Sequence, residues 1–302
     1  MSKLDEFLKH SINKELYGNN VREESVQLLT ELYQEIITRI NSVSYISSKK
    51  MYESLLQEIE ERLQQYNVDY KKILKSHIKT VTNTESEWLN DFLTGIGLSI
   101  VIPTTLFNSV KFSPVTTQVN YEGVADTISE NLKKTVTTSL KNAYLIKEPT
   151  SEVTARLENK LTKFEQNVDV ETATVNTSAF NMTDYLIYKQ NKIKVRYSAM
   201  LDNYTCAVCG SYDGMEFESG SAPLLPVHEN CRCTLIPLEI AEEETPTYSE
   251  WFETLDESDK KEILGKGRYE LYQQGFGLDR FVNNGEKLTL EQLREQNLTT
   301  NE

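Results

Sequence analysis

Residues 206–233 read CAVCGSYDGMEFESGSAPLLPVHENCRC and contain all four cysteines of the chain together with His228, one of its three histidines. The stretch begins with a C-x-x-C pair, continues for eighteen residues, and ends with an H-x-x-C-x-C cluster. Two chain segments with this spacing typically assemble a tetrahedral zinc site. The candidate ligands are Cys206, Cys209, His228, Cys231 and Cys233. We therefore expect one zinc ion per chain.

Two other states of the cysteines compete with metal binding. Disulfides would need an oxidising compartment, and the chain opens with MSKLDEFLKH, which is not an apolar signal segment. Free thiols would leave the gathering of four cysteines and a histidine in one short stretch unexplained. Metal binding is therefore the favoured interpretation.

Five candidate ligands compete for four positions. If a strand follows His228, the side chains of Cys231 and Cys233 point to the same side, so both can approach the ion. We favour Cys206, Cys209, His228 and Cys231, with Cys233 as the substitute, because H-x-x-C forms a compact chelate. Four protein ligands make a zinc site structural, since a catalytic zinc keeps one position open for water. A zinc deaminase would need H-x-E before P-C-x-x-C, which is the reverse of the order here.

The residues around the cysteines predict local structure. Gly210 follows the second cysteine, where a metal-binding knuckle favours a residue that tolerates positive φ. Asp213-Gly214 is a turn signal and predicts a hairpin. Upstream, apolar and basic residues alternate from Lys192 to Ala199, which is typical of a half-buried strand. Its basic row is either a solvated face or a contact for nucleic acid.

The run VRYSAMLDNYTCAVCGSYDGMEF, followed by PVHENCRCTLIPLE, resembles the minor head proteins of tailed bacteriophages, the Mu F-like head-morphogenesis family. The shared features are an Asp before C-x-x-C, an Asp-Gly turn, an aromatic strand, and then Pro, His and C-R-C. Here they are Asp202, Cys206, Cys209, Asp213, Gly214, Phe217, Pro226, His228, Cys231, Arg232 and Cys233. The downstream YSEWFETLDESDKKEILGKGRYELYQQG also resembles that family. The chain departs from the pattern upstream, where Val175-Asn176-Thr177 replaces an Arg-Thr-Glu triplet.

This resemblance implies a virion protein made in the host cytoplasm and placed inside the head. Its expected partners are the portal protein, the major capsid protein or both, and its expected role is head morphogenesis, extended in some members to genome ejection. No Walker or Rossmann phosphate loop is present, and we expect no enzymatic activity. The alternatives are an intracellular zinc-stabilised adaptor that binds another protein, and a zinc-dependent hydrolase or deaminase.

Composition limits the partners further. The chain has 302 residues, a net charge of −14 and a hydrophobic share of 38%, which is low for one compact globule. Phosphate attraction supplies most of the affinity of duplex-binding proteins, so this charge argues against autonomous or sequence-specific binding of nucleic acid. We expect a mostly α protein with an elongated N-terminal helical region and a small α+β zinc-binding C-terminal domain.

Three segments are expected along the chain. Residues 1–115 form an N-terminal helical region, residues 116–240 a Mu F-like minor head domain with its zinc module at 193–238, and residues 241–302 C-terminal helices with a small hairpin. Apolar stripes within residues 1–90 predict a plain helical bundle, a docking arm that lies on a larger partner, or both, since the two are not exclusive. His10 and His77 lie among charged residues and are expected to be solvated.

The remaining segments carry local signals. The apolar run at residues 92–107 is shorter than the ~20 residues that span a bilayer, so we expect a buried helix–turn and no membrane span. Residues 108–121 predict an extended connection, residues 124–140 one helix, and residues from 151 onward a second. A third helix is expected across 169–189. Thr247 with Glu250, and Thr289 with Gln292, predict capping boxes.

Overall fold

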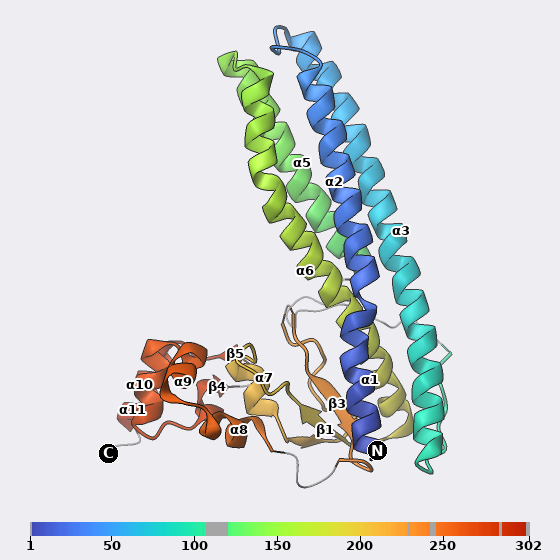
Figure 1. Cartoon of the computed structure of the whole chain (residues 1–302), viewed down its shortest axis with the longest axis vertical. Coiled ribbons are helices and arrows are strands. Elements are labelled where there is room, and N and C mark those ends of the chain that lie inside the picture. The colour runs from blue at the N-terminus through green and yellow to red at the C-terminus, as the bar shows by residue number, and fades with distance from the viewer. Residues whose placement is uncertain are drawn as a thin grey trace. The chain divides into compact units, whose positions relative to one another are not determined.

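The computed structural model describes residues 2–104, 106, 120–228, 230–241, 246–283 and 286–299. As the sequence predicted, these residues are mostly helical, with a small antiparallel sheet of three strands (Figure 1). The helices are α1 (Lys3–Tyr17), α2 (Asn19–Asn41), α3 (Lys49–Gly95), α5 (Tyr121–Ile146), α6 (Thr150–Asn191), α7 (Ala207–Tyr212), α8 (Tyr248–Thr254), α9 (Glu257–Leu264), α10 (Lys266–Gln273), the 3₁₀ turn η1 (Leu278–Phe281) and α11 (Leu290–Thr299). The strands are β1 (Val195–Ser198), β2 (Glu216–Phe217), β3 (Thr234–Pro237), β4 (Val282–Asn283) and β5 (Glu286–Lys287).

The chain divides into two compact units, each built from segments that are distant in sequence. Unit 1 comprises residues 1–11, 88–104 and 181–302, and unit 2 comprises residues 12–87 and 105–180. Helices α1, α3 and α6 each supply residues to both units. The compact units therefore differ from the three contiguous segments expected from the sequence, because single long helices contribute to both.

Unit 2 is a helical bundle in which α2, α3, α5 and the first part of α6 lie side by side (Figure 1). The residues of the apolar stripes are buried in it, namely Leu29, Leu32, Ile36, Ile40, Leu55, Ile59, Leu63, Leu74, Ile78, Leu132, Val136, Leu140, Val153 and Leu157. Polar contacts also join the helices. The hydroxyls of Tyr70 and Thr172 lie 2.9 Å apart, and Arg22 donates two hydrogen bonds to Asp169. The buried residues of these stripes thus form the core of a bundle, as the plain-bundle interpretation predicts.

Helix α6 is continuous where the sequence predicted two helices with an uncertain start near residue 169. The expected break lies in a run of Thr and Val, which have low helix propensity. Packing overrides that propensity, since Thr172 and Val175 are both buried. The Thr174 hydroxyl also donates to the Val170 carbonyl one turn earlier, at 2.8 Å.

The apolar run at residues 92–107 is less buried than expected. Helix α3 ends beyond Leu93, and Gly97 takes a φ of +91°, which only glycine adopts without strain. Residues 94–104 are half-buried or exposed, and Val101 is 62% exposed. Of the extended connection expected at 108–121, residues 108–119 lie outside the described residues. No helix among the described residues is long and apolar enough to cross a membrane.

The two histidines outside the cysteine-rich stretch are not simply solvated. The His10 ring stacks on Trp88, with ring centroids 3.4 Å apart. His77 Nε2 lies 2.8 Å from Asn176 Oδ1 in unit 2, and the Asn176 amide donates to the Lys14 carbonyl. Burial lowers the pKa of His77, although the hydrogen bond with Asn176 opposes this effect. Both rings therefore pack against other side chains.

In unit 1, the three-stranded sheet has the antiparallel order β2-β1-β3, with β1 in the centre. The predicted strand is confirmed, and Val195 and Tyr197 point into the core. Two residues of its basic row are paired with glutamates. Lys194 lies 2.7 Å from Glu218, and Arg196 lies 2.8 Å from Glu216. These pairs fit a solvated face better than a nucleic-acid contact.

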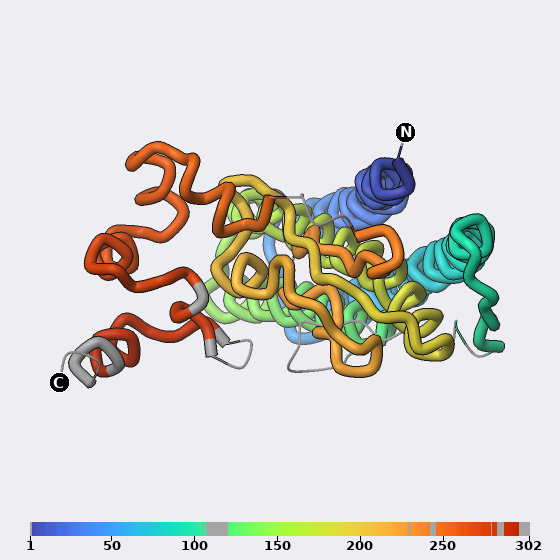
Figure 2. Tube along the Cα trace, turned by 90° about the horizontal axis from the view of Figure 1, so that it is seen from below, coloured from blue at the N-terminus to red at the C-terminus, as the bar shows by residue number. Residues whose placement is uncertain are grey.

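The C-terminal segment forms its own apolar core in unit 1, and both Figure 1 and Figure 2 show residues 246–299 gathered together. The core consists of Tyr248, Phe252, Leu264, Tyr269, Leu271, Phe276, Leu278, Phe281, Leu288 and Leu293. Both predicted capping boxes are confirmed. Strands β4 and β5 pair as the predicted hairpin, while its turn, Asn284-Gly285, lies outside the described residues. The sequence from Leu255 to Tyr272 predicts helical structure with a bend allowed at Gly265, and Gly265, at a φ of +70°, does separate α9 from α10.

Candidate metal centre

The first half of the site is the start of helix α7. Cys206 is the N-cap residue of α7, and its sulfur accepts a hydrogen bond from the Cys209 backbone N–H. An N-cap side chain turns back over the first helical turn, so the C-x-x-C spacing brings both sulfurs to one side. Cys206 is half-buried and Cys209 is buried. The pair therefore presents two thiols at the N-terminus of a helix, where the helix dipole favours thiolates.

The second half is the segment that returns toward strand β3. The Cys231 backbone N–H donates to the His228 carbonyl at 3.2 Å, so the chain turns between them. Asn230 occupies the left-handed region with a φ of +55°. The strand that would place Cys231 and Cys233 on one side does not begin directly after His228, since β3 begins at Thr234. Cys231 and Cys233 are nevertheless both buried beside Cys209.

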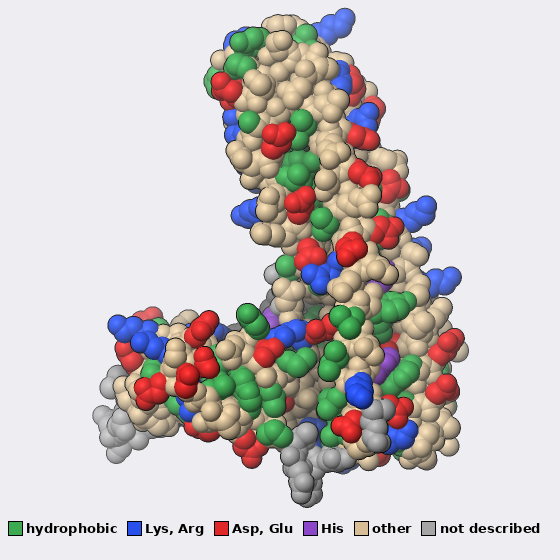
Figure 3. Space-filling model, in the orientation of Figure 1, with side chains coloured by type: hydrophobic (Ala, Val, Ile, Leu, Met, Phe, Trp, Pro, Cys, Tyr) green, Lys and Arg blue, Asp and Glu red, His purple; other side chains and the backbone are tan. Residues whose placement is uncertain are grey.

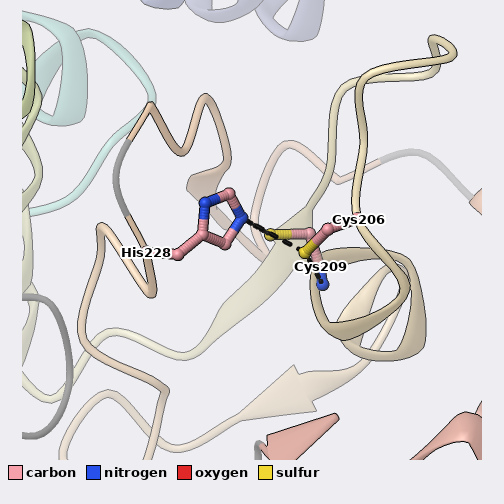
Figure 4. A group of neighbouring side chains, drawn as sticks. All are labelled: Cys206, Cys209 and His228. Carbon is pink, nitrogen blue, oxygen red and sulfur yellow. Dashed lines mark hydrogen bonds between the residues drawn. The ribbon is translucent and has the colours of Figure 1, made fainter. Parts of the chain in front are cut away.

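The five predicted ligands converge in the structure. Figure 4 shows the His228 ring directed at the two sulfurs of the C-x-x-C pair. Its Nε2 atom lies 3.2 Å from Cys206 Sγ and 3.1 Å from Cys209 Sγ. On the other side, Cys209 Sγ lies 3.8 Å from Cys231 Sγ. The ligand atoms form two groups, Cys206 with Cys209 and His228, and Cys209 with Cys231 and Cys233, and the members of each lie within 4.8 Å of one another.

These distances fit a tetrahedral zinc ion. Zinc–sulfur bonds of ~2.3 Å and zinc–nitrogen bonds of ~2.0 Å give tetrahedral edges of about 3.8 Å between sulfurs and about 3.5 Å between sulfur and nitrogen. The Cys209–Cys231 distance of 3.8 Å matches the first value, and the His228 distances are slightly shorter than the second. Cys209 belongs to both groups, so an ion there would contact members of each. Soft thiolate and imidazole donors are the set that zinc prefers.

The protonation of the cluster is uneven. Hydrogen bonds from the Cys209 thiol and from His228 lower the pKa of Cys206 to about 4, although burial opposes this. The pKa of Cys209 is raised, because hydrogen bonding with the sulfurs of Cys206, Cys231 and Cys233, together with burial, favours its protonated form. The sulfurs therefore share protons in the absence of an ion. Metal ligation would displace these protons, since only thiolates bind the ion.

The side chains around the five donors hold the second segment in place. Arg232, which lies between Cys231 and Cys233, donates two hydrogen bonds to Asp202, at 2.5 and 2.8 Å. This bidentate pair connects the C-R-C segment to the loop before C-x-x-C. Burial raises the Asp202 pKa, but the hydrogen bonds from Arg232, the Tyr204 backbone N–H and Thr205, together with the Arg232 charge, lower it overall. The buried Tyr197 of β1 lies beside the cluster, and its pKa is raised by burial and by the neighbouring charges of Cys233, Cys231 and Cys209.

The candidate metal ligands are joined to the C-terminal core by Asp213 and Tyr248. The Asp213 carboxylate accepts hydrogen bonds from the backbone N–H groups of Ala199 and Tyr248, both at 2.6 Å. The Tyr248 hydroxyl donates to the Thr205 carbonyl at 3.1 Å. Helix α8 is therefore fixed against both ends of the loop that carries the first cysteine pair.

Two local predictions for this stretch are wrong. Gly210 lies inside α7 and does not adopt positive φ. It is required because a β-carbon there would lie 2.4 Å from the Tyr248 ring. Asp213-Gly214 does form a turn, with Gly214 at a φ of +78°, but the turn joins α7 to β2 and is not a hairpin between two strands.

Sequence reasoning missed Tyr197 and Tyr248 as parts of the site. The alternating pattern identifies Tyr197 only as an inward-facing strand residue. Its position in the sequence gives no sign that the cysteine cluster lies beside it. Tyr248 lies fifteen residues beyond the last cysteine, in a helix that the capping box predicted. Glu229 lies outside the described residues. No protein-family model, curated protein or solved structure matches the chain.

Proposed function

We propose that this protein is a minor head protein of a tailed bacteriophage, of the Mu F-like head-morphogenesis kind. It is made in the host cytoplasm and placed inside the head, where it contacts the portal protein, the major capsid protein or both. The observation that carries the proposal is the Asp202–Arg232 pair beside the five donors. The Asp, the C-x-x-C pair, the His and the C-R-C segment are the residues on which the resemblance rests, and here they form one connected cluster.

Within this proposal, the cluster binds one zinc ion per chain, and the ion is structural. Cys206, Cys209, His228 and Cys231 hold it, with Cys233 as the alternative fourth ligand. The segment between the two halves is rich in Gly, Ser and Pro and supplies few core residues. In small modules of this kind, metal binding supplies folding free energy on the order of 10 kcal/mol in apparent terms.

A structural role fits the site better than catalysis. Five donors surround a space that needs four, so no position is reserved for water. Cys209, Cys231 and Cys233 are buried, which leaves little room for a substrate beside the ion. The proposal is therefore a non-enzymatic protein whose zinc stabilises the fold.

The test is to follow the protein through head assembly in the phage or prophage that encodes it. We expect mass spectrometry of purified heads to detect the protein, and chemical cross-linking to connect it to the portal ring or the shell. Cys206→Ser combined with Cys209→Ser should abolish its incorporation, while Ser221→Ala, an exposed change in the same stretch, should not. Heads of normal composition that lack the wild-type protein would overturn the proposal.

A further inference from the structure

One end of the unit 2 bundle is an ordered tip made of two chain connections. The tip comprises residues 42–52, which join α2 to α3, and residues 141–149, which end α5 and lead into α6. The Thr150 backbone N–H donates to the Ser44 carbonyl at 3.1 Å, and Tyr45 forms a β-bridge with Pro149. The rings of Tyr52 and Tyr144 stack with centroids 5.3 Å apart. The two connections therefore hold each other in one arrangement.

This tip exposes large apolar side chains. Tyr45 is 50% exposed, Leu145 62% and Ile146 72%. Leu145 and Ile146 form the last turn of α5, beyond the buried stripe that ends with Leu140 and Ala143. Figure 3 shows green hydrophobic side chains at the upper end of the bundle in that view. The bundle does not need these residues for its core, and their exposure to water is unfavourable unless something covers them.

The tip is also basic, although the chain as a whole is strongly acidic. Its charged residues are four lysines, Lys49, Lys50, Lys141 and Lys147, and one glutamate, which gives a net charge of +3 against −14 for the whole chain. All four lysines are exposed. The glutamate, Glu148, accepts two hydrogen bonds from Arg156, at 2.6 and 2.9 Å. Just outside the tip, Glu53 lies 3.4 Å from Lys49, and Arg156 balances Glu148, so the net exposed charge around the apolar side chains is still positive.

We propose that this tip binds the surface of an anionic lipid bilayer. Tyr45, Leu145 and Ile146 enter the headgroup region, and the lysines contact lipid phosphates while their alkyl chains lie along the interface. A polybasic surface with a few inserted apolar side chains binds such membranes reversibly. This is peripheral binding, and no helix crosses the bilayer. The inference does not rest on the proposed head function, although a protein that leaves the head with DNA would meet such a surface.

Charge and composition favour lipid over the other occupants. A second copy of the tip would repel the first, because both carry net positive charge. Protein interfaces are depleted in lysine and enriched in arginine, and the tip contains lysines only. A bilayer accepts a convex tip without a matching pocket, whereas a protein partner would need one.

The test is flotation of the full-length protein with two kinds of vesicle, phosphatidylcholine alone and an equimolar mixture of phosphatidylcholine and phosphatidylglycerol. We expect binding to the mixed vesicles only, weakened by added salt. Leu145→Ser combined with Ile146→Ser should weaken it by about tenfold or more, since two aliphatic side chains no longer insert. Lys49→Glu combined with Lys50→Glu should weaken it by a similar factor.

Matched variants on the sides of the bundle distinguish binding by the tip from nonspecific binding to vesicles. Val68 is 54% exposed on α3, and Val68→Ser should leave vesicle binding unchanged. Lys75→Glu combined with Lys79→Glu makes the same charge change at exposed positions outside the tip, and should weaken binding by much less than the tip pair. Thermal unfolding should be the same for all variants, because every substituted side chain is exposed.

Absence of binding to the mixed vesicles, or equal losses in the tip and control variants, would overturn the proposal. If vesicles are not bound but the tip variants fail to enter heads, the tip contacts an acidic protein surface and the lipid assignment is wrong. Normal entry of the tip variants into heads together with loss of vesicle binding would support both proposals separately.

Discussion

A β-carbon on Gly210 would lie 2.4 Å from the ring of Tyr248, which is closer than packed atoms approach one another. The missing side chain of Gly210 lets α8 pack directly on α7, the helix that carries the first cysteine pair. Tyr248 is 2% exposed and bonded at both its hydroxyl and its backbone N–H, so its ring has little freedom to move away. This close packing therefore adds to the hydrogen bonds of Asp213 and Thr205 that attach the C-terminal core to the candidate metal centre.

Gly210→Ala should lower the free energy of unfolding by about 1–3 kcal/mol, because the added methyl overpacks a fixed interface. Urea unfolding of the metal-loaded protein measures this change. Gly220 is the matched control, since a β-carbon there meets no atom within 4 Å. Gly220→Ala should change stability by less than about 0.5 kcal/mol. If Gly210→Ala is as stable as the control, the Tyr248 ring is not held as the structure indicates.

Protein purified under reducing conditions should contain one zinc ion per chain. Cys209→Ser should remove it, because Cys209 is the donor that both groups of ligand atoms share. Cys231→Ser should also lose the ion, whereas Cys233→Ser should retain it. Elemental analysis of the three variants measures the zinc content.

Cobalt substitution provides a second measurement, because the sulfur-to-cobalt charge-transfer absorption reports how many thiolates bind the ion. The Cys233→Ser protein should give the same absorption as the wild type. Retention of zinc by Cys231→Ser together with its loss from Cys233→Ser would reverse the assignment of the fourth ligand.

His77 should make stability depend on pH. Burial lowers its folded-state pKa below the ordinary value of 6.5. Above pH 6.5 the imidazole is neutral in both the folded and the unfolded chain, so it does not change the free energy of unfolding. As the pH falls through this value, the unfolded chain binds a proton that the folded chain does not, so the free energy of unfolding decreases until the folded-state pKa is passed.

His77→Gln keeps a polar partner for Asn176 and removes this titration. Urea midpoints of the two proteins should therefore differ more at about pH 5.5 than at about pH 7.5, with the wild type losing more stability on acidification. The metal centre is identical in both proteins, so its own pH dependence cancels in the comparison. Equal losses would show that His77 is accessible to protons in the folded state.

The buried pair of Lys14 and Glu85 should behave differently from surface pairs. Their side chains are 8% and 0% exposed, and Lys14 Nζ lies 2.9 Å from a Glu85 oxygen. Lys14→Met should cost about 3–5 kcal/mol, because the Glu85 carboxylate is left buried without its counter-charge. Lys14→Met combined with Glu85→Leu should cost markedly less. Thermal unfolding of the single and double variants completes the cycle.

Lys133 and Glu60 form the matched exposed pair in the same unit, at 3.0 Å and with 54% and 39% of their side chains exposed. Lys133→Met should cost no more than about 1 kcal/mol. A similar loss for Lys14→Met would mean that the Glu85 carboxylate is hydrated or protonated in the folded protein.

A fragment that begins near residue 115 should not fold normally. It keeps α5 and α6 but lacks α1, α2 and α3, so it exposes apolar residues such as Leu132, Leu140 and Leu157. We expect it to aggregate, or to unfold at a lower temperature with reduced helicity by circular dichroism. A monomeric fragment of full helicity would show that α5 and α6 do not need the N-terminal helices, as the separate-arm interpretation of the sequence required.

The sequence alone determined those features that depend on neighbours along the chain. The spacing of Cys206, Cys209 and His228 indicated which donors would meet, because turns and first helical turns have a fixed geometry. The 3.6-residue period of the apolar stripes identified the long helices, and the strand at Val195 followed from a period of two. The two capping boxes were predictable for the same reason, since each uses residues three apart.

Only the tertiary structure decided which distant segments meet. From the sequence, the apolar stripes of residues 1–90 could pack on a partner protein or on other helices of the same chain. Only the structure shows that they pack on α5 and α6. Low propensity predicted a break in α6, and burial of Thr172 and Val175 overrode it. The contact of Gly210 with Tyr248 has no local signature, because a glycine required by a neighbour's ring looks the same in sequence as one required by positive φ. These features depend on packing between segments that are distant in sequence, and no short stretch of the chain contains that information.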